Sequence, residues 1–166
     1  MGHHVLALVA QLDAACQAAD RLADATISAF RRHADHPIIT SQPGLGELTG
    51  ARVLAELGDD RTRFAHPRAL KADAGAAPIT RASGKRRQVI VRRVKNQRLA
   101  AVGYVWAFAA LTASPGARAH YDRRKTTGDQ HTAAQRHLFN RLLGCLYHCL
   151  TTGQPYNETK AFPPAA

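Results

Sequence analysis

Apolar residues near the N-terminus recur at alternating steps of three and four positions. They are Val5, Leu8, Leu12, Ala15, Ala19, Leu22, Thr26 and Ala29. This spacing keeps one apolar seam on a helix and is typical of coiled coils. It predicts a coiled-coil-like helix over about residues 3–34, within a first segment of residues 1–36. Alanine and threonine bury little apolar area, so the pattern leaves open whether the seam packs on the chain's own body or on another chain.

The pattern then changes to shorter apolar stretches separated by turn residues. Helix start and stop signals include Asn96, Ser114-Pro115, Gly58 and Gly153. The helices predicted between them cover about residues 48–57, 67–74, 96–113, 114–124 and 130–151. We therefore expect a mainly α fold, with a compact helical domain over 37–156 and a flexible tail over 157–166.

A tight turn, Pro43-Gly44-Leu45-Gly46, precedes the first helix of this domain. A Pro-Gly-apolar-Gly turn before a helix resembles the helix-hairpin-helix element. In that element, backbone N–H groups at positions such as Gly44 and Gly46 hold a DNA phosphate. The alternative interpretation is a plain corner between two helices.

Positive charge is concentrated between residues 81 and 98. The chain carries a formal net charge of +11, with 23 Lys and Arg against 12 Asp and Glu. No acidic residue lies between Asp73 and Asp122. The cations of this window are Arg81, Lys85, Arg86, Arg87, Arg92, Arg93, Lys95 and Arg98. Such a concentration of positive charge indicates a polyanionic partner, DNA or RNA.

The β-branched run Val89-Ile90-Val91 within this window predicts a basic loop or a short β arm. A membrane surface is a weaker alternative partner, because Gly84 and this run interrupt any basic amphipathic helix. No apolar stretch of about 20 residues predicts a membrane span, and the N-terminus shows no signal peptide.

Cysteine usage and metal-ligand spacing exclude several other classes. Cys16, Cys145 and Cys149 are an odd number without paired spacing, which argues against a disulfide scaffold and favours a cytoplasmic location. Cys145, His148 and Cys149 share one helix, but no second ligand pair completes a zinc site. The carboxylates are scattered, so we predict no metal site and no cofactor for this chain.

Ser83 supplies the one hydroxyl inside the basic window, and Gly84 beside it lets a DNA backbone come close. Neighbouring arginines and lysines would hold a phosphate and stabilise added charge on it. Nothing nearby in the sequence is an obvious base. The residues alone therefore favour Ser83 as a hydrogen-bond donor to phosphate over Ser83 as a nucleophile.

Several short motifs follow one another in a characteristic order. They are Pro43-Gly44-Leu45-Gly46, Ala55-Glu56-Leu57-Gly58-Asp59, Arg63-Phe64, Ala74-Gly75-x-x-Pro78, Ser83-Gly84 and Arg93-x-x-Asn96-x-x-Leu99. Over about residues 43–156 the chain resembles the C-terminal domain of insertion-sequence transposases that pair a RuvC-like DEDD domain with a catalytic serine, the bridge-RNA-guided recombinases. The N-terminal heptads resemble the coiled-coil segment of that family.

The resemblance implies DNA strand exchange in which Ser83 attacks DNA and forms a covalent phosphoserine intermediate. It also implies a guide RNA as partner, and Mg²⁺ held by carboxylates of a RuvC-like domain. This chain starts at the coiled-coil segment, so it is expected to be inactive unless that domain is supplied. The alternative is a non-catalytic nucleic-acid-binding or regulatory remnant. Asp73, Ala76, Lys95 and Gln135-Arg136-His137 depart from the family's usual residues.

Overall fold

The computed structural model describes residues 2–84 and 86–163, with the backbone alone at Arg87. The described part is mainly α, as expected, with one two-stranded antiparallel sheet. The elements are α1 (Gly2–Arg31), α2 (His36–Thr40), α3 (Glu47–Leu57), α4 (Pro67–Asp73), β1 (Ile79–Ser83), β2 (Arg86–Ile90), α5 (Gln97–Ala113), α6 (Pro115–Thr126), α7 (His131–Thr152) and α8 (Glu158–Ala161).

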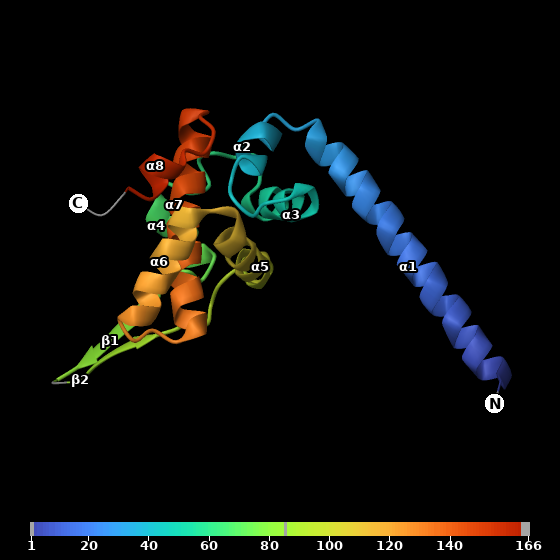
Figure 1. Cartoon of the computed structure of the whole chain (residues 1–166), viewed down its shortest axis with the longest axis horizontal. Coiled ribbons are helices and arrows are strands. Elements are labelled where there is room, and N and C mark those ends of the chain that lie inside the picture. The colour runs from blue at the N-terminus through green and yellow to red at the C-terminus, as the bar shows by residue number, and fades with distance from the viewer. Residues whose placement is uncertain (1, 85, 164–166) are drawn as a thin grey trace.

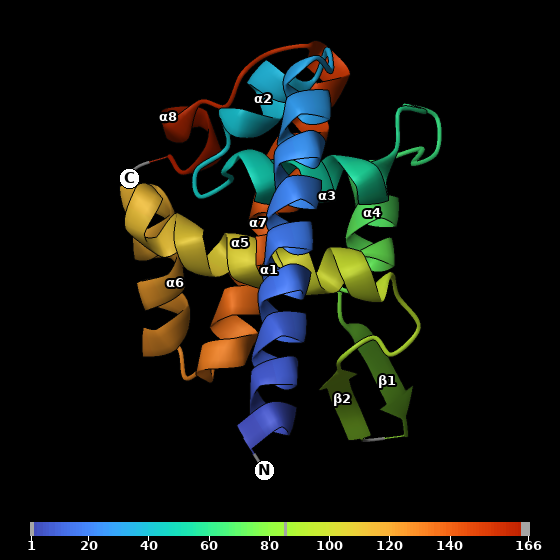
Figure 2. The ribbon, with the colours of Figure 1, turned by 90° about the vertical axis from the view of Figure 1, so that its right-hand side faces the viewer.

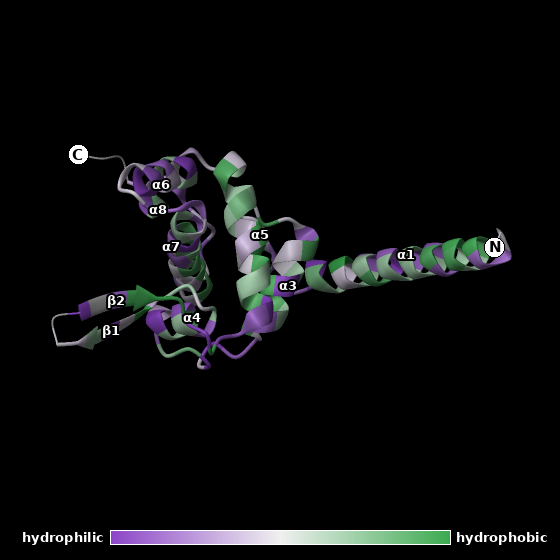
Figure 3. Ribbon diagram, turned by 90° about the horizontal axis from the view of Figure 1, so that it is seen from below, coloured by the Kyte–Doolittle hydropathy of each residue, from purple (hydrophilic) through white to green (hydrophobic). Residues whose placement is uncertain are grey.

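The first helix, α1, projects from the body as a rod (Figure 1). Its 30 residues span about 45 Å at 1.5 Å per residue. Only its C-terminal end is anchored, where the buried Phe30 ring packs edge-on against the His36 ring at 4.8 Å. Along the seam, Leu8 and Leu12 are 64% and 65% exposed. The seam therefore does not pack on the chain's own body, and Figure 3 shows apolar colour along this free part of α1.

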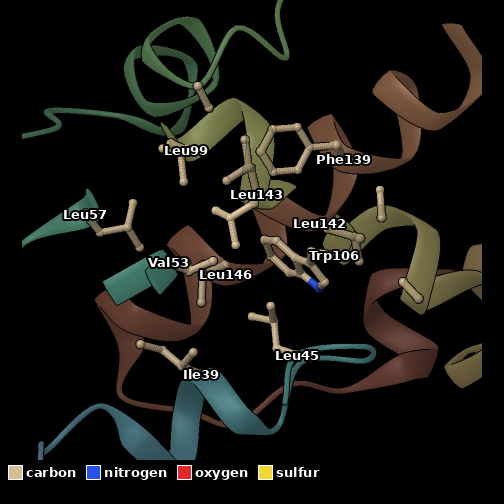
Figure 4. Packing of buried hydrophobic residues seen from close by; sticks show 14 of the residues in the cluster. Ile39, Leu45, Val53, Leu57, Leu99, Trp106, Phe139, Leu142, Leu143 and Leu146 are labelled. Atoms are coloured by element: carbon tan, nitrogen blue, oxygen red, sulfur yellow. The ribbon is translucent and has the colours of Figure 1, made fainter. Parts of the chain in front are cut away.

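The core lies where α2, α3 and α5 meet the long helix α7. Figure 4 shows Ile39, Val53 and Trp106 packed against leucines of α7, all of them fully or almost fully buried. The Trp106 indole Nε1–H donates to the carbonyl of Pro43 at 2.9 Å, which satisfies its polar atom inside the core. This single bond also fixes the turn between α2 and α3 against α5.

Helices α5 and α7 cross closely at Gly103. A Cβ at this position would lie 2.0 Å from Cζ of Phe139. Glycine therefore lets the Phe139 ring lie directly on the α5 backbone. The bounds of α5 agree with the predicted helix over about 96–113.

The start and stop residues predicted from the sequence lie at the helix ends in the structure. Asn96 accepts a hydrogen bond from the Leu99 N–H at 3.0 Å, and Ser114 accepts one from the Ala117 N–H at 2.9 Å. Gly58 and Gly153 adopt positive φ angles of 74° and 67° directly after their helices. These caps satisfy backbone groups that the helix itself leaves unpaired.

Strands β1 and β2 form a hairpin that extends away from the helical body (Figures 1 and 2). The sequence predicted a basic loop or a short β arm here, and the structure shows the β arm. The arm also has a first strand that was not predicted, since all of Ile79–Ser83 pairs with Arg86–Ile90. Backbone hydrogen bonds between the strands, rather than apolar burial, hold this strand, since four of the five β1 residues are exposed.

The C-terminal segment corrects the prediction of a flexible tail for residues 158–162. Helix α8 starts at an Asn157 cap and packs on α6 and α7, with Ala161 buried. Ser114 and the Gly116 N–H both donate to Glu158 Oε1, at 2.7 and 2.8 Å. Residues 164–166 of the predicted tail lie outside the described residues.

Candidate nucleic-acid interface

The hairpin register places Ser83 directly opposite Arg86. Side chains directly opposite each other in a sheet point to the same face, as do residues two apart on a strand. Ser83, Arg86 and Arg81 therefore share one face of the hairpin. All three are exposed. The seryl oxygen is thus flanked by two guanidinium groups on an open surface.

Gly84 lies at the tip of the hairpin with a positive φ of 54°. Among the described residues, no heavy atom lies within 4 Å of where its Cβ would be. The described residues other than its chain neighbours therefore leave the space beside Gly84 open. Lys85, the other predicted contact at the tip, lies outside the described residues, and only the backbone of Arg87 is described.

The remaining predicted cations follow the hairpin toward α5. Arg93 and Arg98 are exposed, whereas Arg92 and Lys95 are half-buried. Among the described side chains of this window, none forms an ion pair. They are Arg81, Arg86, Arg92, Arg93, Lys95 and Arg98. This positive charge is therefore available to an external anion rather than neutralised inside the protein.

Asn96 fastens the end of the basic segment to the helical body. Besides capping α5, its amide Nδ2 donates to Glu56 Oε2 on α3 at 2.8 Å. Its backbone N–H donates to the carbonyl of Asp73 at the end of α4 at 2.7 Å. One residue therefore joins the hairpin's return strand to three helices.

The other end of the hairpin is held by a close contact at Gly75. This residue has φ of 70°, and a Cβ there would lie 2.2 Å from Cδ of Lys95. The aliphatic part of Lys95 thus crosses over Gly75, which brings the two ends of the hairpin segment together. Arg63 stabilises the neighbouring α3 by donating to the carbonyls of Glu56 and Leu57 at 2.8 and 3.0 Å.

Chemical partners for Ser83 are absent from the part of the chain that the structure describes. No described residue forms a hydrogen bond with its hydroxyl. Among residues 2–84 and 86–163 no three His, Cys, Asp or Glu side chains form a group able to hold a metal ion. The described residues therefore offer electrostatic support for a phosphate, but neither a general base beside Ser83 nor a Mg²⁺ site.

The Gly44 turn lies far from the hairpin along α5. A Cβ at Gly44 would lie 2.5 Å from the backbone N of Ala110, near the C-terminal end of α5, whereas the basic segment enters α5 at its first turn. Thirteen residues of helix separate Gln97 from Ala110, or about 20 Å. Figure 2 shows the two regions on opposite sides of the body.

Close packing on α5 is sufficient to account for glycine at position 44. At the same turn, Gly46 is exposed and caps α3. The first residue of α3, Glu47, already bears a negative charge, with Arg31 and His36 at 3.3 and 3.1 Å. Phosphate binding by Gly44 and Gly46 stays a prediction, and the structure does not bring these glycines together with the basic hairpin.

Sequence reasoning did not identify Glu56 and Asp73 as supports of the site. Glu56 lies 40 positions from its partner Asn96, so no local pattern connects the two. Motif order was the only available signal, because Glu56 and Asn96 both belong to the ordered set of short motifs. The structure shows that several of these motif residues hold the hairpin in place.

Within the described ranges, no single helix is long and apolar enough to cross a membrane. Only α5 and α6 taken together meet the length and composition requirement, and they are bent by 108°.

Comparison with known proteins gives a consistent set of similarities. The model of the transposase IS116/IS110/IS902 family matches residues 36–122. The candidate mini-circle transposase for IS117 from Streptomyces coelicolor is 63% identical over 163 residues, which cover 98% of this chain and 39% of that protein.

Two further relatives are proteins of insertion elements. An uncharacterized 42 kDa protein of IS900 from Mycobacterium paratuberculosis is 37% identical over 129 residues, covering 77% of this chain and 32% of the relative. An uncharacterized 43.6 kDa protein of IS110 from Streptomyces coelicolor is 34% identical over 140 residues, covering 83% and 34%. The chain thus spans at most about two fifths of the length of these relatives.

Proposed function

Because this chain belongs to the IS116/IS110/IS902 transposase family, we propose that it is the part of an insertion-sequence transposase that binds DNA and presents Ser83 to a phosphodiester. The observation that carries the proposal is the exposed hairpin face on which Ser83 stands between Arg81 and Arg86. DNA is the proposed partner, in the cytoplasm.

Binding would rest on the phosphate backbone. The cations between residues 81 and 98 are not engaged in ion pairs with described residues, so they can neutralise phosphates and release condensed counterions. Gly84 leaves the hairpin tip open to a bulky strand. Asn96 and Gly75 hold both ends of the hairpin, which gives the charges a fixed position relative to the body.

Catalysis would use Ser83 as the nucleophile. Its Oγ forms a bond to phosphorus while the bond from phosphorus to the leaving deoxyribose oxygen breaks, and Arg81 and Arg86 stabilise the added negative charge. The seryl proton must pass to a base, and the leaving oxygen must gain a proton. Neither group is found beside Ser83 among the described residues, so we propose that carboxylates outside them complete the site.

Mg²⁺ is the metal that the family resemblance implies. The described residues do not fit it, since they contain no group of three potential ligands. We therefore assign no step of the reaction to a metal held by this chain.

The salt dependence of DNA affinity tests the binding proposal. Each phosphate contact contributes about −0.9 to the slope of log affinity against log salt on duplex DNA. The double variant Arg81→Gln, Arg86→Gln should therefore lose about 2 from the slope. Arg21→Gln, at an exposed position on α1, is the matched control and should leave the slope unchanged. Equal slopes for both variants would contradict a DNA-binding hairpin.

Covalent trapping tests the proposed nucleophile. The chain is incubated with duplex DNA, Mg²⁺, guide RNA and a separately supplied RuvC-like domain, and a protein–DNA adduct is sought on a denaturing gel. Ser83→Ala should abolish the adduct while DNA affinity changes less than about twofold. Thr80→Ala, which removes an exposed hydroxyl from the opposite face of the same strand, should keep it. An adduct that persists in Ser83→Ala excludes Ser83 as the nucleophile.

A second candidate function is nucleic-acid binding without catalysis, as in a regulatory remnant. The lack of a described base or carboxylate group near Ser83 favours it. It is distinguished by normal salt-dependent binding together with no adduct, even when the rest of a transposase is supplied.

A further proposal concerns oligomerisation. The seam of α1 is exposed over most of its length, and pairing with the same seam of a second copy would bury it. Guide RNA remains a proposed partner on the strength of the family resemblance alone.

A further inference from the structure

A cavity of about 320 Å³ opens at the foot of the hairpin, between α5 and α7. Its size falls within the range of small-ligand pockets. The wall is mostly apolar, with a few polar and basic groups. Its lining includes Val91, Lys95, Tyr104, Ala133, Gln135 and Arg136. Val91 and Lys95 follow β2 directly, so the cavity adjoins the proposed nucleic-acid-binding segment.

Gln135 fixes the position of Tyr104 at this wall. The side chain is 1% exposed, and its Nε2 donates to the carbonyl of Tyr104 at 3.1 Å. That bond fixes the orientation of the amide, because the carbonyl accepts and cannot donate. The Oε1 atom is buried from solvent, so Gln135 supports the wall and presents no group to a ligand.

Tyr104 and two cations give the cavity its recognition elements. Tyr104 is 50% exposed although it is a large aromatic side chain on the core helix α5. Lys95 and Arg136 bring positive charge to the wall, and none of the described residues that line it is acidic. An exposed aromatic side chain beside two cations suits a flat group attached to a phosphate.

We infer that this cavity receives one nucleobase, unstacked from the strand that the hairpin holds. The Tyr104 ring stacks on the base, and Lys95 and Arg136 contact the flanking phosphates. Unstacking one base costs a few kcal/mol in a duplex and less in a single strand. The inference rests on the proposed function of the hairpin, and it adds a position-specific contact to an otherwise electrostatic interface.

Base removal provides the test. The full chain is titrated with 12-nucleotide single strands of DNA and of RNA, each lacking one internal base at successive positions. Removing the base that enters the cavity should weaken binding on the order of tenfold at one position, whereas other positions should change little. The strand type that shows this loss identifies the source of the base.

Matched variants on α5 assign the effect to Tyr104. Tyr104→Ala should remove the position-dependent loss, and Tyr104→Phe should retain it because the ring remains. Phe108→Ala removes another exposed aromatic side chain one turn along the same helix and should behave as the unmodified chain. Ala133→Leu should fill the cavity and remove the effect while the salt dependence stays unchanged. Circular dichroism verifies that each variant is folded.

The outcomes separate this inference from the proposed function. Salt-dependent binding that is indifferent to base removal at every position overturns the cavity as a base site and leaves the binding hairpin standing. Retention of the loss in Tyr104→Ala also overturns it. Absence of binding to any strand, at low salt, overturns both.

Discussion

Asn96 shows how much one residue contributes to the proposed interface. Its side-chain oxygen caps α5, its side-chain nitrogen reaches Glu56 on α3, and its backbone N–H reaches the end of α4. None of these contacts touches DNA in our proposal. The residue instead determines where the basic segment leaves the body.

Replacing Asn96 by Ala should lower the free energy of unfolding by about 2 kcal/mol. A lost N-cap accounts for about 1 kcal/mol, and the half-buried Glu56 carboxylate loses its donor. Chemical denaturation monitored by circular dichroism measures the change. Asn96→Ser keeps a side-chain cap but loses the amide donor without adding a charge beside Glu56, so it separates the two contributions. A loss below about 0.5 kcal/mol for Asn96→Ala would contradict this role.

Gly44 is constrained both by its own backbone and by that of α5. It has φ of 80°, and a Cβ would lie 2.5 Å from the backbone N of Ala110. Gly44→Ala should therefore destabilise the chain by about 3 kcal/mol, through backbone strain and overpacking. Gly46→Ala is the control from the same turn, since its nearest neighbour would be 3.8 Å away. Thermal unfolding should show a large decrease in Tm for the first variant and a small one for the second.

Glu158 makes the stability of the fold depend on pH in the acid range. Its partial burial raises the pKa, but hydrogen bonds from Ser114, Tyr156 and the Gly116 N–H outweigh burial and hold the pKa below its ordinary value of 4.5. A depressed carboxyl pKa stabilises the fold above the ordinary pKa, and this stabilisation is lost as pH falls through the folded-state pKa. Tm measured from pH 7 to pH 3 should thus fall less for Glu158→Gln than for the unmodified chain. Parallel curves would show that Glu158 does not contribute.

A helix or strand could be predicted from the sequence when the residues that define it are neighbours in the chain, and could not when they are far apart. Caps at Asn96 and Ser114 were predictable because cap and helix are neighbours in sequence. The β1 strand was not, because its pairing with β2 is encoded in backbone hydrogen bonds and not in an alternating apolar pattern. Likewise, α8 depends on Glu158 meeting Ser114, which lies 44 positions away. Ser83 was identified from the sequence, but its shared face with Arg81 and Arg86 required the register.

The hairpin should also be less protected in hydrogen exchange than the helices of the core. Its strands bury little apolar surface, with only Ile79 and Ile90 half-buried among the described side chains, so local opening need not disrupt the core. We expect β1 and β2 amides to exchange at least about 100-fold faster than those in the middle of α7. Peptide-resolved mass spectrometry measures this. Protection of the hairpin equal to that of α7 would show that the hairpin is part of the core.

The whole molecule combines a helical body with two projections, the α1 rod and the hairpin (Figure 1). The body has an apolar core of its own, so the exposed seam of α1 is not needed for folding. Sequence pattern alone left the partner of this seam undecided. The structure excludes packing on the chain's own body in the described conformation.

Pairing of two α1 helices predicts a dimer. Leu12→Lys places a charge on the seam and should shift sedimentation at micromolar concentration from dimer toward monomer. Ala14→Lys adds the same charge two positions away, off the seam, and should leave the dimer in place. Both variants should retain the same Tm for the body at a concentration where the chain is monomeric. A monomer at all concentrations before mutation would contradict pairing.

Because the hairpin contributes little to the core, its residues can change over generations more freely than those of the helical body. Substitutions on its exposed strands hardly affect the folding equilibrium, so most of them escape selection against unfolding. Changes at Asn96, Gly75 or Gly44 are removed because they destabilise the body. Under the proposed function, a lineage can therefore vary the DNA contacts of the hairpin while its attachment to the body stays fixed, and divergence in target choice would accumulate without loss of the fold.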